Sequence, residues 1–306
     1  MMRDLSDLSI AIVSWNTCDR LRACLASLQD DLRAGARIVV VDNASHDGSA
    51  DMVAREFPDV ALIRNTTNTL FAAATNQAAQ ACHRPYLMLL NPDTELRAGC
   101  LAELATFLDG HLDHAATAPR MEDAAGQPQH AAMGFPSWWT PLLFATPIER
   151  WWPGAPGLQR YHASTFDPNV DADLDQPPAA AFLVRRDDWD ALRGFREELP
   201  LFFNDVDLCR RLIDAGRRIG YCAQARLVHH TGSATRQLSD FAEQWHRDRL
   251  TYHRLHHGWL AGPWVKACTT FAWADHAAQQ WSARLRRRSF EPVGPSWRAL
   301  RRHWAA

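Results

Sequence analysis

The segment at residues 38–49, IVVVDNASHDGS, constrains the fold of this 306-residue chain more than any other stretch. Four consecutive apolar residues lead directly into Asp42 and Asn43, and the turn signal Asp47-Gly48 follows. An apolar run bounded in this way predicts a strand that is buried on both faces of a parallel sheet. Asp42 then stands at the carboxyl end of the strand, where open α/β sheets bind ligands, and Ser49 is expected to cap the next helix. A simple turn residue is the alternative interpretation of Asp42.

The same alternation of strand-like and helix-like segments continues over the first 120 residues. Apolar runs predict strands at residues 8–13, 37–41, 60–63, 86–90 and 116–120, and helical spacing predicts helices at 21–28, 49–57 and 71–82. This pattern is typical of βαβ units and a mostly parallel sheet. Three of the strands end in polar residues at one predicted edge, which favours a ligand site there. These residues are Ser14, Asn16, Asp42, Asn43, Asn91 and Asp93.

Composition excludes several other classes of protein. The net charge of -2 gives no nucleic-acid signature, so we expect no nucleic-acid partner. The seven cysteines form no CxxC pair, which indicates neither a disulfide framework nor a zinc cluster and suits a reducing compartment. The opening MMRDLSDLS is polar, and no apolar run approaches the roughly 20 residues that span a bilayer. We therefore expect a cytoplasmic protein without a signal peptide.

A dinucleotide site would suit such a sheet, but neither GxGxxG nor GxxxxGK[ST] follows any predicted strand. A phosphate would have to be held in another way. Asp93 emerges just after a buried strand, with Pro92 stiffening the turn. A carboxylate in this position suits Mg²⁺ or Mn²⁺, which take oxygen ligands and bridge to substrate phosphates. The alternative is an ordinary Pro-Asp turn.

Four segments, in this order and spacing, resemble glycosyltransferase family 2, and in particular its bacterial rhamnosyltransferase-like members: SIAIVSWN, VVVDNASHDGS, LLNPDTEL and LFFNDVDLCRRL. The resemblance covers residues 8–232. It implies a GT-A fold, a UDP- or dTDP-sugar donor, a divalent metal ion and inversion at the anomeric carbon. The implied activity is transfer of a sugar, with rhamnose suggested, to a saccharide or lipid-linked acceptor in surface polysaccharide synthesis.

The resemblance also implies roles for individual residues. Asp42 would read the pyrimidine base, and Asn91-Pro92-Asp93 stands where the DXD motif of the family holds the metal. The family usually has Gly before Phe71, at the position of Leu70, which leaves the path of that loop open. The residues expected around the donor nucleotide are Ser14, Asn16, Asp42, Asn68 and Asn91, and Asp93 is the expected metal ligand.

In LFFNDVDLCRRL, apolar residues precede Asn204-Asp205, after which helical spacing begins. Sugar transfer by direct displacement needs a base for the acceptor hydroxyl. The family motif usually reads Glu-Asp-x-Asp, and its first Asp, which matches Asp205, is the general base; Asn204 here replaces the Glu. Asp207 and Arg211 match the pattern as supporting residues. A helix cap is the alternative role of Asp205.

Two adjacent histidines end the predicted strand in ARLVHHTG. A histidine after a strand is more often structural than a ligand, but in several related GT-A enzymes a His at this point completes the metal shell. His229 is the nearer match and His230 the second. An imidazole ligand favours Mn²⁺ slightly over Mg²⁺.

We expect a GT-A domain at residues 1–237, with a nucleotide half at about 1–120 and an acceptor half at about 121–237, followed by a helical extension at 238–306. Residues 134–161 are rich in Pro, Gly and Trp, which predicts a loop-like insertion. Acceptor specificity can reside in such a segment. Its tryptophans either cover a core or anchor at a membrane interface. Clustered arginines in the extension suit peripheral contact with the inner face of the cell membrane, and a solvated helix face is the alternative. These are Arg284, Arg286, Arg287, Arg288, Arg298, Arg301 and Arg302.

Two other functions remain open. Leu70 and Asn204 both depart from the family pattern, which keeps a catalytically impaired GT-A domain acting as a saccharide-binding subunit under consideration. A sugar nucleotidyltransferase would also use a pyrimidine-binding α/β sheet. That class is expected to show a glycine-rich, basic loop after its first strand, which residues 14–22 do not provide.

Overall fold

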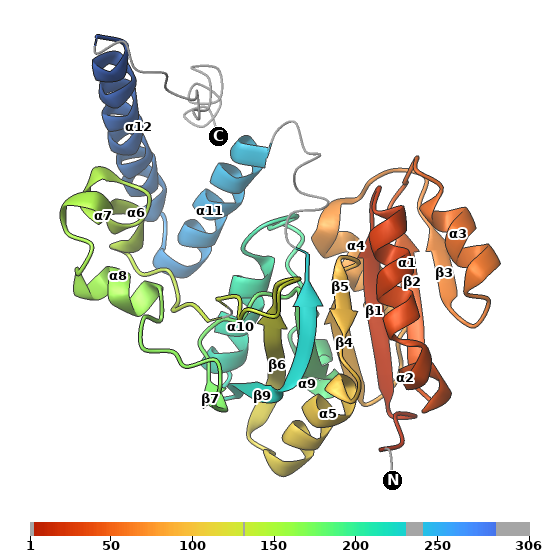
Figure 1. Ribbon diagram of the computed structural model, residues 1–306. Coiled ribbons are helices and arrows are strands. Elements are labelled where there is room, and N and C mark those ends of the chain that lie inside the picture. The colour runs from red at the N-terminus through yellow and green to blue at the C-terminus, as the bar shows by residue number, and fades with distance from the viewer. Residues whose placement is uncertain (1–2, 131, 231–240, 286–306) are drawn as a thin grey trace. The chain divides into compact units, whose positions relative to one another are not determined.

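A computed structural model describes residues 3–130, 132–230 and 241–285 of the protein (Figure 1). The chain divides into two compact units. Unit 1 comprises Met1–Met133 and Phe166–Leu238, and unit 2 comprises Gly134–Thr165 and Ser239–Ala306. The predicted insertion thus groups with the C-terminal helices.

Unit 1 is built on a sheet that holds nine strands within its described residues, in the order β3-β2-β1-β4-β8-β6-β9-β5, with β7 paired to β9. The pairs among β1 to β4 are parallel, as predicted. Strand β8 is antiparallel to both of its neighbours, β4 and β6, and it joins the N-terminal strands to the rest of the sheet. The strands are β1 (Leu8–Ser14), β2 (Arg37–Asp42), β3 (Ala61–Arg64), β4 (Tyr86–Leu90), β5 (Thr94–Leu96), β6 (His114–Glu122), β7 (Ala172–Asp173), β8 (Ala181–Arg185) and β9 (Arg218–His229).

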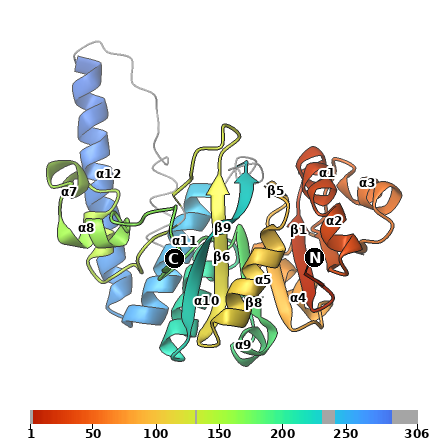
Figure 2. The same cartoon turned by 60° about the horizontal axis from the view of Figure 1, so that its bottom comes forward.

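Helices flank this sheet, as Figures 1 and 2 show. Alternate residues of β1 and β2, including Ile10 and Val40, share one buried cluster with Leu25 and Leu104, because side chains along a strand point to opposite faces in turn. The main core therefore lies between this face of the sheet and the two helices that carry Leu25 and Leu104, α1 and α5. The helices of unit 1 are α1 (Cys18–Ser27), α2 (Gln29–Arg33), α3 (Ser49–Glu56), α4 (Leu70–Gln80), α5 (Cys100–Gly110), α9 (Arg186–Ala191) and α10 (Asn204–Asp214).

The predicted capping of α3 by Ser49 is wrong. Gly48 is the N-cap residue, with a φ of +84°, and Ser49 is already the first residue of the helix. The carboxylate of Asp47 accepts the Ser49 N–H at 3.0 Å and the Cys18 N–H at 2.8 Å. Asp47 thus replaces the expected cap and also ties the start of α1 to that of α3.

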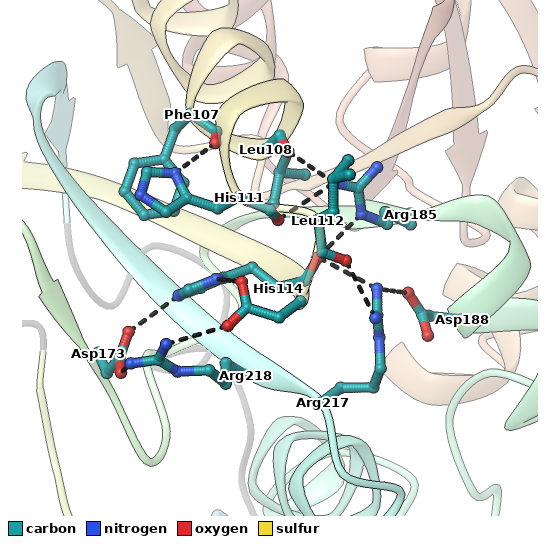
Figure 3. Close-up of polar contacts among 11 residues, drawn as sticks. Phe107, Leu108, His111, Leu112, His114, Asp173, Arg185, Asp188, Arg217 and Arg218 are labelled. Carbon is teal, nitrogen blue, oxygen red and sulfur yellow. Dashed lines mark hydrogen bonds and ion pairs between the residues drawn. The ribbon is translucent and has the colours of Figure 1, made fainter.

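Ion pairs fasten the amino ends of β6 and β9 (Figure 3). Both ring nitrogens of His114 lie 2.9 Å from carboxylate oxygens, one of Asp113 and one of Asp173. Arg218 contacts the same two carboxylates and lowers the pKa of Asp113 to about 2. Arg185 donates to the carbonyls of Leu108 in α5 and His114 in β6, and Arg217 donates to that of Leu112 in the turn between them. This network lies at the end of the two strands opposite to His229.

The described part of unit 2 is mainly helical, and it includes three short helices in the segment predicted to be loop-like. Each of these three has Pro in its first turn, where the missing N–H costs nothing. Pro263 likewise lies in the first turn of the helix that begins at Ala261, so the break between helices lies at residues 258–260, slightly before the predicted Gly262-Pro263. No helix among the described residues is long and apolar enough to cross a bilayer. The helices are α6 (Thr140–Leu143), α7 (Pro147–Trp151), α8 (Pro156–Tyr161), α11 (Phe241–His257) and α12 (Ala261–Leu285).

The arginine cluster predicted for membrane contact lies outside the described residues, apart from the backbone of Arg284 in the last turn of α12.

Candidate active site

A cavity of about 350 Å³ opens in unit 1 at the carboxyl ends of the parallel strands. Strands β1, β2 and β4 run in parallel register, so the residues that follow them meet at one edge of the sheet. Asn43 and Asp93 reach the cavity from the segments after β2 and β4, His229 from the end of β9, and Asp205 from the first turn of α10. The predicted edge therefore carries a cavity lined by several of the predicted residues.

Asn43 organises the loop beside the cavity, although the sequence patterns gave greater weight to its neighbour Asp42. The Asn43 Nδ2 group donates to Asn68 Oδ1 at 2.8 Å, and its Oδ1 accepts from the Thr69 N–H at 3.0 Å. Asn68, which was predicted at the nucleotide, lines the cavity as part of this network. The Asn43 side chain thereby connects the end of β2 to the start of α4.

Asp42 is buried at the last position of β2, and only 4% of its surface is exposed. Its Oδ2 accepts the Ser45 N–H at 3.1 Å, whereas its Oδ1 has no hydrogen-bond partner among the described residues. Buried polar atoms are almost always hydrogen-bonded, so an acceptor of this kind calls for an explanation. Asp42 is not itself part of the cavity lining.

Ser14 and Asn16 do not line the cavity, although both were predicted at the nucleotide. The Ser14 hydroxyl is buried against the Thr17 hydroxyl at 2.9 Å, and Asn16 Oδ1 accepts the His46 N–H at 2.8 Å. Val13 and Trp15 line the cavity in their place. The alternation of side chains along a strand is the signal that could have identified Trp15.

Leu70 occupies the position where the resembled family usually has Gly, and its backbone φ is +64°. Its N–H donates to Asn68 Oδ1 at 2.8 Å, and its side chain lines the cavity. Phe203, immediately before Asn204, also lines the cavity and has a φ of +61°. Residues with a side chain rarely adopt this left-handed conformation, which costs free energy and clusters at functional sites.

Asp93 and His229 form the pair predicted to hold a metal ion. One oxygen of the buried Asp93 carboxylate lies 3.5 Å from His229 Nε2, and both side chains line the cavity. Thr94 in β5 and His229 in β9 are direct partners across the sheet. Asp93 immediately precedes Thr94, which explains why its side chain lies near that of His229. His230 Nε2 instead lies 2.7 Å from Glu95 Oε1, and His230 is not part of the cavity lining.

The chemistry of this pair fits a divalent ion whose remaining ligands come from a substrate. A carboxylate oxygen and an imidazole nitrogen suit Mn²⁺, and such ions are commonly bound by one or two protein groups together with phosphates and water. No group of three or more His, Cys, Asp or Glu residues in the described part of the chain could form a complete protein cage. The donor set is therefore an open one.

Asp205 reaches the cavity from the first turn of α10. Its Oδ2 accepts the Ala179 N–H at 3.2 Å, and its Oδ1 accepts the Val206 N–H at 2.8 Å. Burial raises the pKa of the Asp205 carboxyl, and these backbone donors oppose the rise only in part. A carboxylate with a raised pKa beside a cavity is a candidate general base.

Asn204, which replaces the family Glu, is buried and forms part of the cavity lining beside Asp205. Its Nδ2 group donates to the Leu199 carbonyl at 3.2 Å. A carboxylate could not donate this hydrogen bond. Asn204 thereby fastens the segment 199–203, which contributes Leu201, Phe202 and Phe203 to the cavity wall.

Asp207 and Arg211 lie behind the cavity rather than in it. Arg211 Nε lies 2.7 Å from Asp207 Oδ2, one helical turn away, and the Asp207 side chain is fully buried. The other two nitrogens of the Arg211 guanidinium donate to the carbonyls of Leu192 and Gly194, each at 2.8 Å. The pair thus holds the turn that leads into the segment containing Phe203.

Comparison with known proteins agrees with these features. Residues 9–164, half of the chain, match the family described as Glycosyl transferase family 2. A curated relative, the N-acetylglucosaminyl-diphospho-decaprenol L-rhamnosyltransferase of Mycobacterium tuberculosis, is 24% identical over 271 residues, which cover 84% of this chain and 87% of the relative.

Two solved structures are similar in fold. GalNAc-T7 with UDP, GalNAc and Mn²⁺ has a TM-score of 0.60 at 15% identity; the match covers 83% of this chain but only 48% of that one. The mannosyltransferase PcManGT from Pyrobaculum calidifontis, in complex with GDP-Man and Mn²⁺, has a TM-score of 0.55 at 17% identity, with coverage of 98% and 85%. These likenesses confirm the predicted GT-A fold.

Proposed function

Because this chain belongs to glycosyltransferase family 2, we propose that it is an inverting, metal-dependent enzyme that transfers a sugar from a UDP- or dTDP-sugar to a saccharide or lipid-linked acceptor. The name of the mycobacterial relative supports rhamnose as the sugar and a lipid-linked acceptor. In our proposal this transfer serves surface polysaccharide synthesis. One observation carries the proposal: Asp93, His229 and Asp205 line the same cavity.

Donor binding is supported by the groups at the ends of β1 and β2. The indole of Trp15 offers an apolar surface in the cavity wall. Asp42 Oδ1, which has no hydrogen-bond partner in the described part of the chain, is an acceptor at the end of β2. The imide N–H of uracil or thymine is a donor of the matching kind. Asn43 and Asn68 would maintain the loop beside the nucleoside through their 2.8 Å hydrogen bond.

Asp93 and His229 would hold the divalent ion, which when bound neutralises charge on the donor diphosphate. Without that ion the Asp93 carboxylate would face the like-charged diphosphate. The buried position of Asp93 and its proximity to His229 Nε2 at 3.5 Å keep both groups directed at one point. Arg211 and Asp207 would contribute indirectly, by holding the turn that leads to Phe203.

Asp205 would accept the proton of the acceptor hydroxyl as that oxygen attacks the anomeric carbon from the face opposite to the diphosphate. Its raised pKa makes it a stronger base than an ordinary Asp. The bonds from the Ala179 and Val206 amides orient the carboxylate. A purely structural cap would not need a position in the cavity wall.

Two variants test this proposal together. Asp205→Asn should preserve calorimetric binding of UDP or dTDP with Mn²⁺, while transfer falls about 10² to 10⁴-fold, the usual contribution of a general base. Asp93→Ala should lose the Mn²⁺-dependent part of nucleotide binding. Asp214→Asn is the matched control, since Asp214 lies on the same helix, pairs with Arg210 and is absent from the cavity lining.

The outcomes separate the alternatives. Undiminished transfer in Asp205→Asn would remove Asp205 as the base, and unchanged Mn²⁺ dependence in Asp93→Ala would remove the metal assignment. A wild-type protein that binds nucleotide sugars but transfers none across a panel of donors and acceptors would be the saccharide-binding module instead.

A further inference from the structure

The exposed large apolar side chains of this protein are concentrated in unit 2. Among the described residues, all of those most exposed to solvent belong to unit 2 except Leu112 and Val170. Soluble proteins seldom gather such side chains on one surface unless it contacts something. The members in unit 2 are Trp139, Trp151, Trp152, Phe241, Leu255, Trp259, Leu260, Phe271 and Trp281.

Ring contacts show that several of these residues lie along one face of α12. Trp139 lies 5.9 Å from Trp264, and Trp151 lies 6.4 Å from Phe271, measured between ring centroids. Trp264 and Phe271 are separated by seven residues, or two helical turns, which places them on the same side of the helix. The short helices of the insertion thus add their tryptophans to a stripe that runs along α12.

Two more exposed apolar side chains lie in the turn between α11 and α12, next to the start of the stripe. Trp259 in this turn is 80% exposed, and the adjacent Leu260 is 53% exposed. An indole and an isobutyl group held outward at a helical corner would be costly in water. We name Trp139, Trp151, Trp152, Trp259, Leu260 and Phe271 the aromatic surface.

Between Asp248 and Asp275, the charged residues that accompany the aromatic surface all have one sign. No Asp or Glu occurs between Asp248 and Asp275, whereas Arg249, Arg254 and Lys266 fall within that interval. Arg254 is exposed and lies close enough to Lys266 to join burial in lowering the pKa of that lysine. An anionic partner would relieve the repulsion between these two cations.

We propose that the aromatic surface, with Arg254 and Lys266, docks unit 2 onto an anionic lipid bilayer. Tryptophan suits the interface because its ring is apolar while its N–H stays in the polar layer. Cations next to such residues attract anionic headgroups. The contact is peripheral, since no described helix could span the bilayer. The inference does not depend on the proposed transfer reaction.

Co-sedimentation of the full chain with vesicles tests this docking. Wild type should bind phosphatidylglycerol-containing vesicles and bind pure phosphatidylcholine more weakly, with the difference shrinking at high salt. Trp259→Ala combined with Leu260→Ala should weaken binding about tenfold or more to both vesicle types, because apolar burial is lost. Arg254→Gln with Lys266→Gln should weaken only anionic binding, by about fivefold for each charge.

Leu112→Ala and Val170→Ala serve as matched controls, because both remove an exposed apolar side chain from unit 1, and neither should alter vesicle binding. Circular dichroism would verify that each variant is folded. Unchanged vesicle binding in the Trp259/Leu260 variant would overturn the proposal. This would also be the result if arginines beyond the described residues provided all the attraction. A wild-type oligomer that this variant converts to a monomer, without any vesicle effect, would identify the surface as a self-interface and also overturn it.

Discussion

The left-handed backbone of Leu70 can be tested by the sign of a difference in stability between two variants. Its φ of +64° lies in the left-handed region, which costs a residue with a Cβ roughly 1–2 kcal/mol. Glycine escapes that cost but loses roughly 0.5–1 kcal/mol through its greater freedom in the unfolded chain. Leu70→Gly should therefore be more stable than Leu70→Ala by about 0.5–1 kcal/mol. The comparison between the two variants cancels the loss of the leucine side chain.

The thermal midpoint of unfolding is measured for each variant by circular dichroism. About 0.5–1 kcal/mol corresponds to roughly 1–4 °C for a domain the size of unit 1. Ala102→Gly within α5 is the control, and there glycine should lower the midpoint, since it costs about 1 kcal/mol relative to alanine inside a right-handed helix. If Leu70→Ala melted above Leu70→Gly, residue 70 would not be left-handed and the explanation of the family glycine would fail.

Two further predictions concern the first turn of α10. Burial raises the pKa of Asp205, and a base acts only when it is deprotonated. Transfer should therefore fall as the pH drops through a midpoint above about 4, the usual pKa of Asp. A pH–rate profile with its acidic midpoint at or below about 4 contradicts this prediction. Asn204→Asp removes the donor to the Leu199 carbonyl and should destabilise unit 1 by about 1–3 kcal/mol. The added charge should also move the acidic midpoint of transfer to higher pH, so an unchanged thermal midpoint and pH profile would count against the assigned contact.

Local sequence patterns predict the elements of unit 1 well because each periodicity reflects burial of one segment. Residues 86–90 are a strand with the predicted bounds, since its apolar run is buried on both faces. The position of β8 between β4 and β6 could not be predicted in this way. That arrangement depends on pairing between residues 86–90 and 181–185, which no local pattern encodes.

The site shows the same division between local and long-range information. Polar residues after strands predict a ligand site at one edge of the sheet, and Asp93, His229 and Asp205 line one cavity at that edge. Motif resemblance assigned Asp205 and His229, whereas Asp93 was also indicated by its position after a buried strand, and the chemical roles of all three remain predictions. The Ala179 N–H that orients Asp205 could not be anticipated, because a backbone donor has no sequence signature.

Trp138 and Trp139 are synthesised long before the residue against which they pack, and this has a consequence for folding on the ribosome. Both indoles pack against Trp264, which follows them by more than a third of the chain. At the usual elongation rates, the interval is on the order of ten seconds. During that time the aromatic segment is synthesised without the helix that partly covers it, and in the first part of the interval β6 also lacks β8 and β9. Nascent chains of this protein therefore pass through a long stage at which exposed aromatic side chains invite chaperone binding or aggregation.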